Sequence, residues 1–384
     1  MNYIGFNFQR EIFCFIIFIT LINSANSYLA FKYPHAFKLN NRNIFVIHEL
    51  GITICDETFT ESIDRVVTFS ESEQINSDSA LSKVTSVNAN YYIICLINDK
   101  IYIFNEEGYF LRKSSNLITS LNVEYYTLEY IAIQSDYLYF IIGFISDAKL
   151  YLYSYKYQIS DKTIYRFGAL ENTNYYNIKN NGLSCHFMKY LTSSYEYTNL
   201  ITCLYTATEG RIAFEFFDIT TTSLYKSSTK SKTAILTQSE VRYIKATIFN
   251  DRKKLLVGWI TSGRVPYYWM YDINNNINTY TISYFQQSYC KFIPHGFIVN
   301  HYPEKSMIIY TCLFYSNSWA DPGATILVES VNERFVQTNY TYKYVNCDLN
   351  GYSIVYLNAK SNYYIISDAD CSTKLWPLNL LFGD

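Results

Sequence analysis

Short runs of apolar and aromatic residues, separated by turn residues, recur along almost the whole chain. Runs rich in Ile, Tyr, Phe, Val and Thr are typical of β-strands, and helical periodicity is nearly absent after residue 27. Residues 43–48 and 51–55 flank a tight turn, and residues 100–104 and 109–112 flank a longer turn that ends in glycine. The pattern predicts a β-hairpin at each place.

One segment alternates strictly between two kinds of side chain. From Lys149 to Tyr157, every second residue is a tyrosine, and the residues between run from leucine to lysine. A period of two indicates a strand. The segment Tyr137–Ile145 is almost wholly apolar, but it is far shorter than the roughly 20 residues that a membrane-spanning helix needs. It therefore predicts a buried strand.

Grouped in order, the strands form about seven sets, with room for four strands in each. The sets begin near residues 34, 82, 124, 182, 240, 288 and 341. Repeats of this length without helices are typical of closed β-architectures. We predict an all-β fold, a β-propeller of about seven four-stranded blades, with Tyr28–Lys32 as the outer strand of the last blade. The alternative is a pair of tandem β-sandwiches, although the chain contains no evident linker.

The N-terminus has the layout of a secretory signal. The apolar run Ile12–Leu21 is too short to cross a bilayer, which takes roughly 18 residues or more. Ala25 and Ser27 supply the small side chains that signal peptidase accepts. We predict a signal peptide at residues 1–27, a single domain at 28–384 and location outside the cell or on its surface. An uncleaved signal anchor is the alternative.

Composition and charge narrow the partners. The formal net charge is −2, from 31 Lys and Arg against 33 Asp and Glu, with no long block of either sign. We therefore expect no nucleic-acid partner, and no membrane span after signal cleavage. Aromatic residues make up 18% of the chain, with 41 Tyr and 26 Phe. Such abundance is also typical of an AT-rich coding sequence, so a single tyrosine says little about function.

Eight cysteines remain after the signal, an even number that predicts disulfides in an exported chain. The pattern around Cys185 and Cys203 recurs around Cys290 and Cys312, with each pair on successive strands. The predicted pairs are Cys185–Cys203, Cys290–Cys312, Cys347–Cys371 and Cys55–Cys95. Connectivity cannot be derived from spacing alone. Zinc sites need close cysteine pairs, which this chain lacks, so we expect no metal.

Motifs of catalysis and of cofactor binding are missing: the zinc-protease, nucleophile-elbow, P-loop and dinucleotide fingerprints do not occur. We expect no catalytic residue and no cofactor. The alternative is a secreted propeller-type hydrolase of the glycosidase kind, with carboxylates such as Asp64, Asp136 and Asp251 converging at the propeller face. His186 follows Cys185 directly and is interpreted as an ordinary strand position.

The remaining candidates are surface features. Rings are favoured anchors at binding surfaces, and two aromatic groups could form one. The candidates are Tyr151, Tyr153, Tyr155, Tyr157, Tyr267, Tyr268, Trp269 and Tyr271. Asn339 begins the one glycosylation sequon and predicts an exposed loop. Together these features favour a secreted or cell-surface binding or adhesion module for an extracellular protein or glycan.

Overall fold

The computed structural model describes most of residues 35–378, and from Asn278 onward the description covers strand backbones only. Segments outside the description are 40–42, 57–61, 76–82, 90, 116, 118–122, 173–177, 192–196, 209, 221–223, 228–232, 237–239, 250–252, 263–265, 275–277, 284–296, 303–306, 316–323, 333–336, 346–351, 358–361 and 368–374. The signal at 1–27 and the strand predicted at Tyr28–Lys32 lie outside it too.

The described strands form seven antiparallel sheets, numbered here as blades one to seven in chain order. Blades one to four contain β1 (His35–Lys38), β2 (Ile44–His48), β3 (Gly51–Cys55), β4 (Ser62–Thr68); β5 (Val84–Ala89), β6 (Tyr92–Ile97), β7 (Lys100–Asn105), β8 (Phe110–Lys113); β9 (Val123–Gln134), β10 (Tyr137–Ser146), β11 (Lys149–Gln158), β12 (Thr163–Asn172); and β13 (Ile178–Leu191), β14 (Tyr197–Ala207), β15 (Arg211–Ile219), β16 (Leu224–Lys226), β17 (Thr233–Leu236).

The last three blades follow the same up-and-down order. They contain β18 (Val241–Phe249), β19 (Lys254–Thr261), β20 (Pro266–Asp272), β21 (Asn278–Ser283); β22 (Phe297–Tyr302), β23 (Met307–Tyr315), β24 (Ala324–Asn332), β25 (Gln337–Val345); and β26 (Tyr352–Leu357), β27 (Asn362–Ser367), β28 (Leu375–Leu378). A 3₁₀ turn, η1 (Glu71–Glu73), joins blade one to blade two.

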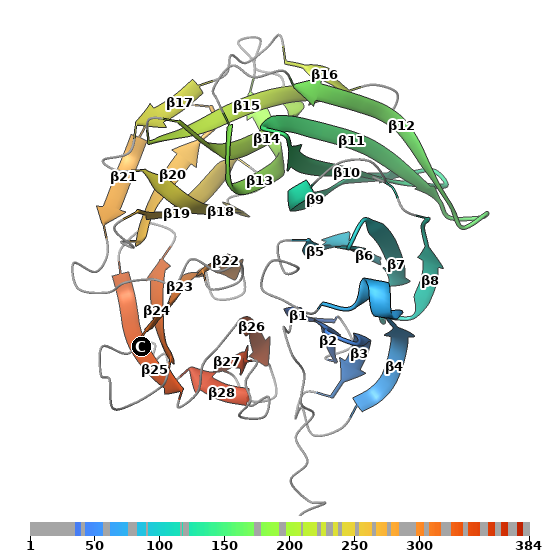
Figure 1. The fold of residues 1–384 in the computed structure, drawn as a ribbon, viewed down its shortest axis with the longest axis horizontal. Coiled ribbons are helices and arrows are strands. Elements are labelled where there is room, and N and C mark those ends of the chain that lie inside the picture. The colour runs from blue at the N-terminus through green and yellow to red at the C-terminus, as the bar shows by residue number, and fades with distance from the viewer. Residues whose placement is uncertain are drawn as a thin grey trace, which may run out of the picture.

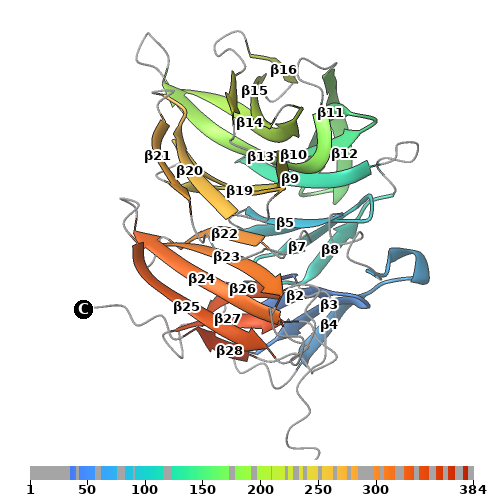
Figure 2. The same ribbon diagram turned by 60° about the vertical axis from the view of Figure 1, so that its left-hand side comes forward.

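The blades stand around a common axis, and the first strand of each lies innermost (Figure 1). The innermost strands contact one another around the ring: β5 with β9, β9 with β13, β13 with β18 and β18 with β22. Strand β26 contacts β1, so the last blade lies beside the first, as a second view also shows (Figure 2). The fold is a β-propeller, which confirms the predicted fold class.

Both predicted hairpins are present, and the predicted blade starts agree with the structure through blade five. Blades six and seven begin later, at Phe297 and Tyr352, and residue 341 lies inside β25 instead of opening a blade. Strands β23, β24 and β25 contain nine residues each, so blade six extends further along the chain than the predicted spacing allowed.

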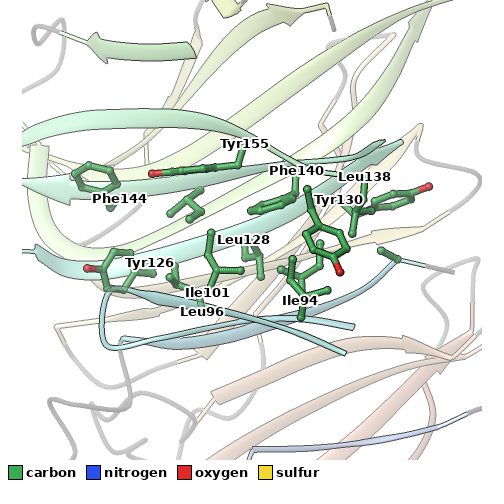
Figure 3. Packing of buried hydrophobic residues seen from close by; sticks show 14 of the residues in the cluster. Ile94, Leu96, Ile101, Tyr126, Leu128, Tyr130, Leu138, Phe140, Phe144 and Tyr155 are labelled. Carbon is green, nitrogen blue, oxygen red and sulfur yellow. The ribbon is translucent and has the colours of Figure 1, made fainter. Parts of the chain in front are cut away.

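The cores lie between blades, and one of them explains the alternating tyrosines. Between blades two and three, Ile94 and Leu96 pack against Leu128 and Phe140, and the ring of Tyr155 on β11 stacks on Phe140 (Figure 3). Tyr155 is 2% exposed and the ring of Tyr151 stacks on Phe144 with centroids 4.9 Å apart. Tyr157 is buried in the same core and Tyr153 packs against it.

The predicted binding surface on β11 is therefore wrong, for a physical reason. Leu150 and Leu152, on the other face of this strand, pack into the core between blades three and four. A strand in the middle of a blade has a neighbouring blade on each side. The tyrosine face of β11 therefore packs against the neighbouring blade, although each ring has a hydroxyl group.

The second aromatic group, on β20, is also buried in an inter-blade core. Trp269 and Tyr271 on β20 are buried, and both rings lie against Phe214 of blade four, at centroid distances of 5.8 and 4.7 Å. Tyr267 is half-buried and stacks on Trp259. The side chain of Tyr268 lies outside the description. The described members of this group form core, which corrects the prediction of a binding surface here.

A buried ion cluster fastens the connection between blades one and two. Glu73 in η1 is 2% exposed, and its carboxylate forms ion pairs with Lys100 and Lys113. The backbone N–H and the hydroxyl of Ser70 also donate to it, at 3.1 and 2.9 Å. Burial raises the pKa of this carboxyl, but the hydrogen bonds from Lys100, Lys113 and Ser70 outweigh burial and hold the pKa well below its usual range.

We predict that Glu73→Gln destabilises the domain at pH 7 by about 1.5 to 3 kcal/mol, because charge-assisted hydrogen bonds are lost in a buried site. Since the folded-state pKa is lowered, the contribution is present above the unfolded-state pKa of about 4.3 and is lost as the pH falls below it. Urea unfolding at pH 7, 5 and 3 should show the gap between wild type and variant shrinking with acid.

The matched control is Glu171→Gln, which removes the exposed pair between Lys149 and Glu171. Exposed pairs contribute little, at most about 1 kcal/mol. Equal losses for the two variants, or a gap that grows at pH 3, would contradict the role assigned to Glu73.

Candidate functional site

A cleft of about 470 Å³ lies between blades three and four and has the geometry of a ligand pocket. Its volume is within the range of small-molecule sites. Strands β9 and β10 supply one wall, and β13, β14 and the end of β15 supply the other. The lining residues are Ile131, Ala132, Gln134, Tyr139, Phe187, Lys189, Asn199, Ile219 and Thr220.

Strand alternation explains the apolar part of the lining. Ile141 and Ile145 of β10 belong to the core between blades three and four, and Tyr139 shares their face of the strand. Phe187 of β13 belongs to the same core, and Ile131 of β9 packs against it. The cleft is thus the outer end of an inter-blade core, where apolar side chains meet solvent.

Polar groups gather at the rim. Lys189 on β13 and Asn199 on β14 are directly opposite each other in the ladder. Lys189 is half-buried and Asn199 is exposed. Gln134 ends β9 and Thr220 follows β15, so amide, hydroxyl and ammonium groups from two blades converge beside a pair of aromatic rings. None of the lining residues within the described part of the chain has a carboxylate.

A disulfide holds the blade-four wall together. Cys185 on β13 and Cys203 on β14 are opposite each other and bonded, which confirms this predicted pair. Cys185 also ties the two walls: its N–H donates to Thr127 Oγ1 at 3.1 Å, and the Thr127 hydroxyl is 3.4 Å from the Cys185 carbonyl oxygen. Cys185, which makes both the disulfide and this contact between blades, is two residues before Phe187 of the cleft lining.

Gly143 on β10 makes the close approach possible. A Cβ at this position would lie 2.7 Å from Thr127 Cγ2 and 3.0 Å from Cys185 Sγ. Any larger residue would push blade three away from the disulfide. The glycine therefore sets the distance between the two walls of the cleft.

A second polar link joins the same blades and was missed by sequence reasoning. The hydroxyl of Ser184 lies 2.7 Å from His186 Nε2, and His186 Nδ1 lies 3.5 Å from the Glu129 carboxylate. Ser184 and Glu129 are buried. Because Glu129 is on β9 and His186 on β13, this chain of contacts couples the innermost strands of blades three and four.

The other cysteine predictions have different outcomes. Cys55 and Cys95 are buried thiols without a bond between them, so that predicted pair is wrong. Cys95 faces the core between blades one and two, whereas Cys55 lies on the strand face opposite Ile52 and Ile54, which point into that core. The two thiols therefore face in different directions. Cys290, Cys347 and Cys371 lie outside the described residues, so Cys290–Cys312 and Cys347–Cys371 stay predictions.

The remaining candidates are also placed. Asn339 lies within β25, the outermost strand of blade six, so the predicted loop is wrong at this position. Asp136 is half-buried in the β9–β10 turn, where its carboxylate accepts a hydrogen bond from the Ser160 N–H at 3.0 Å and stabilises the turn. The hydrogen bond from the Ser160 hydroxyl is the main cause that lowers the pKa of Asp136. The Asp64 side chain and Asp251 lie outside the description.

Two features are absent from the described part of the chain. There, no helix has the length and apolar character needed to cross a bilayer. Nor do three or more His, Cys, Asp or Glu side chains gather there in a way that could hold a metal ion.

Comparison with known proteins gives the fold class. No protein-family model and no curated protein matches the chain. The WD40 domain of Pan2 from Neurospora crassa is similar over 92% of this chain and 90% of that chain, with a TM-score of 0.50 and 8% identity. The six-bladed β-propeller lectin of Aleuria aurantia is similar over 80% of this chain and 92% of the lectin chain, with a TM-score of 0.46 and 8% identity. The similarity to the Pan2 domain extends to the fold alone, and the chain is a β-propeller with a cleft between two blades.

We predict that replacing both Cys185 and Cys203 by alanine destabilises the domain by about 3 kcal/mol, because the bond closes a short loop of the unfolded chain. Guanidinium unfolding should show this gap without reductant and its disappearance with reductant. Peptide mapping without reduction should recover residues 185 and 203 as one linked fragment and Cys55 and Cys95 as free thiols. Alkylation of Cys185 and Cys203 in unreduced, denatured protein would contradict the assignment.

We also predict that Gly143→Ala destabilises the domain by about 1 to 3 kcal/mol through overpacking against Thr127 and the disulfide. Gly168→Ala on β12 is the control, because the atom closest to its added Cβ is the Ser154 hydroxyl at 2.9 Å, which can rotate away. Thermal unfolding of both variants measures the two losses of stability. An equal loss for the two variants would show that the close contacts of Gly143 do not determine the packing of the two blades.

Proposed function

We propose that this protein is an extracellular binding module that takes a carbohydrate residue in the cleft between blades three and four. The observation that carries the proposal is the composition of the cleft: two aromatic rings, Tyr139 and Phe187, beside amide, hydroxyl and ammonium groups. Sugars present an apolar C–H face and a set of hydroxyl groups. Rings match the first, and Gln134, Asn199 and Thr220 match the second.

Lys189 adds a preference for negative charge. Among the lining residues that the structure describes, it is the one with a charged side chain, and it lies opposite Asn199 in the ladder. An ammonium group at the rim favours a carboxylate or sulfate over a neutral hydroxyl. We therefore propose an acidic sugar, such as a uronic acid or a sulfated residue, as the preferred ligand class.

The same lining argues against the hydrolase alternative. Glycoside hydrolysis uses two carboxyl groups flanking the bond that is cleaved. The described residues that line the cleft include none, and Asp136, one of the predicted candidates, is engaged in the turn with Ser160. Binding without cleavage is the activity that these side chains support.

Export from the cytosol is part of the proposal. It rests on the signal-like residues 1–27 and is supported by the Cys185–Cys203 disulfide, because such bonds persist in oxidising compartments. Cys55 and Cys95 do not conflict with export. Burial raises the pKa of the Cys55 thiol to about 12 and also raises that of Cys95, so neither forms the reactive thiolate.

The test is a glycan array probed with the secreted chain, followed by calorimetry with the best glycan. We expect acidic glycans to bind, and Lys189→Met to weaken binding by at least 10-fold, since a charge-assisted hydrogen bond contributes about 1.5 to 3 kcal/mol. Asn199→Ala should weaken binding less, by several-fold, because it removes neutral hydrogen bonds.

Lys226→Met is the matched control, since Lys226 is exposed on β16 in the same blade and away from the cleft. Binding by this variant should equal that of wild type. The proposal fails if no glycan binds, or if Lys189→Met and Lys226→Met bind equally well.

A further inference from the structure

The blade-three wall of the cleft is the inner part of a longer sheet face. Ala132 and Gln134 on β9 line the cleft, and they lie opposite Tyr139 and Tyr137 on β10. Residues that lie directly opposite each other in a ladder share one face of the sheet. Two rows of side chains therefore begin in the cleft and continue outward across blade three.

The row that begins at Ala132 ends in an exposed ring. Tyr139 lies opposite Lys156 on β11, and Lys156 lies opposite Tyr165 on β12. Tyr165 is 43% exposed. Tyr139 and Tyr165 are separated by two strand spacings, which amount to about 10 Å. This distance leaves room for a second sugar residue beside the one proposed to bind in the cleft.

The described strands of blade four cover only part of this face. Strands β10, β11 and β12 have ten residues each, whereas β16 and β17, the outer strands of blade four, have three and four. A Cβ added to Gly168 on β12 would lie 3.8 Å from Leu224 of β16. Cover by β16 therefore reaches Gly168, while Tyr165, nearer the ends of β11 and β12 that project at the right of Figure 1, is exposed.

Three rings and one ammonium group make up the outer part of the face, which we call the aromatic platform: Tyr137, Tyr165, Phe167 and Lys156. The Tyr139 ring of the cleft lies 6.2 Å from the ring of Tyr137 and 5.8 Å from that of Phe167, measured between centroids. The ammonium of Lys156 lies 4.6 Å from the centre of the Tyr137 ring and 5.9 Å from that of Tyr165. The platform and the cleft are therefore continuous through Tyr139.

The charge of Lys156 is not paired with a carboxylate in the described part of the chain. None of the ion pairs found there includes this residue. Asp136 and Asp161 lie in the turns at this end of the blade, where both carboxylates contact the Ser160 hydroxyl. Cation–π contacts hold the half-buried Lys156 against the rings without neutralising its charge. An acidic ligand would thus meet a positive charge whose position is already fixed.

We propose that the aromatic platform is a second subsite next to the cleft, and that the ligand is an acidic oligosaccharide. One sugar residue occupies the cleft beside Lys189, and the next lies against the ring of Tyr165 with its carboxylate or sulfate at Lys156. This inference rests on the function proposed for the cleft. It adds to that function a requirement for chain length and for acidic groups on neighbouring sugar residues.

The test is calorimetry at pH 7 with two series of probes. One series is galacturonic acid and its short oligomers, and the other is sulfated glucosamine and short heparin oligosaccharides. In the series that binds, affinity should rise by about 10-fold or more from the monosaccharide to the oligomer, because a second charge-assisted contact is made. K156M should remove most of this rise and Y165A part of it, and both variants should bind the monosaccharide as the wild type does. K189M should weaken the binding of monosaccharide and oligomer alike.

Two variants outside the platform are the matched controls. Tyr225 on β16 is 46% exposed, and by alternation its side chain points away from the face that carries Leu224. Lys149 lies at the opposite end of β11 from Lys156. Y225A and K149M should bind monosaccharide and oligomer as the wild type does.

The outcomes separate this inference from the function proposed for the cleft. A monosaccharide that binds without any gain from chain length would overturn the second subsite and leave the cleft proposal standing. So would oligomers that bind the wild type, K156M and Y165A equally well. Polyglutamate that binds as tightly as the oligomers would show that charge alone is recognised, and would also overturn the subsite. Failure of every probe to bind would overturn both proposals.

Discussion

Packing of each sheet against a neighbouring sheet on both of its faces is the constraint on which the other features of this propeller depend. Strand β11 shows it: Tyr155 lies in the core with blade two, and Leu152 lies in the core with blade four. A sheet covered on both faces has little room for charge, because burying an unpaired charge is costly. Glu73, which is buried, is paired with Lys100 and Lys113.

The same constraint explains what could be predicted from sequence. Hairpins and strands follow from local alternation, so β2, β3, β7 and β8 were predicted almost to the residue, and the repeat length gave the propeller. Alternation also marks two different faces of a strand. It does not say what covers each face, so the tyrosines of β11 were interpreted as a binding surface when a second sheet in fact covers them.

The cysteines show the same limit. Cys185 and Cys203 lie on successive strands of one sheet, and antiparallel pairing brings such residues together. Cys55 and Cys95 belong to different sheets. Which side chains of two such sheets face each other depends on how the blades are arranged around the ring. The cleft could not be predicted for a similar reason: its lining comes from five strands of two blades and from Thr220, which follows the last of them, and no local motif joins these residues.

The cleft occupies a place where this architecture leaves polar groups without full coverage by a neighbouring blade. It lies where an inter-blade core ends, so its chemistry is mixed, with Phe187 and Tyr139 beside Lys189. The disulfide and the Thr127 contact that hold its two walls belong to the same pair of blades, so one inter-blade contact both fixes the walls and supplies the lining. A ligand of this cleft therefore needs an apolar face as well as polar groups.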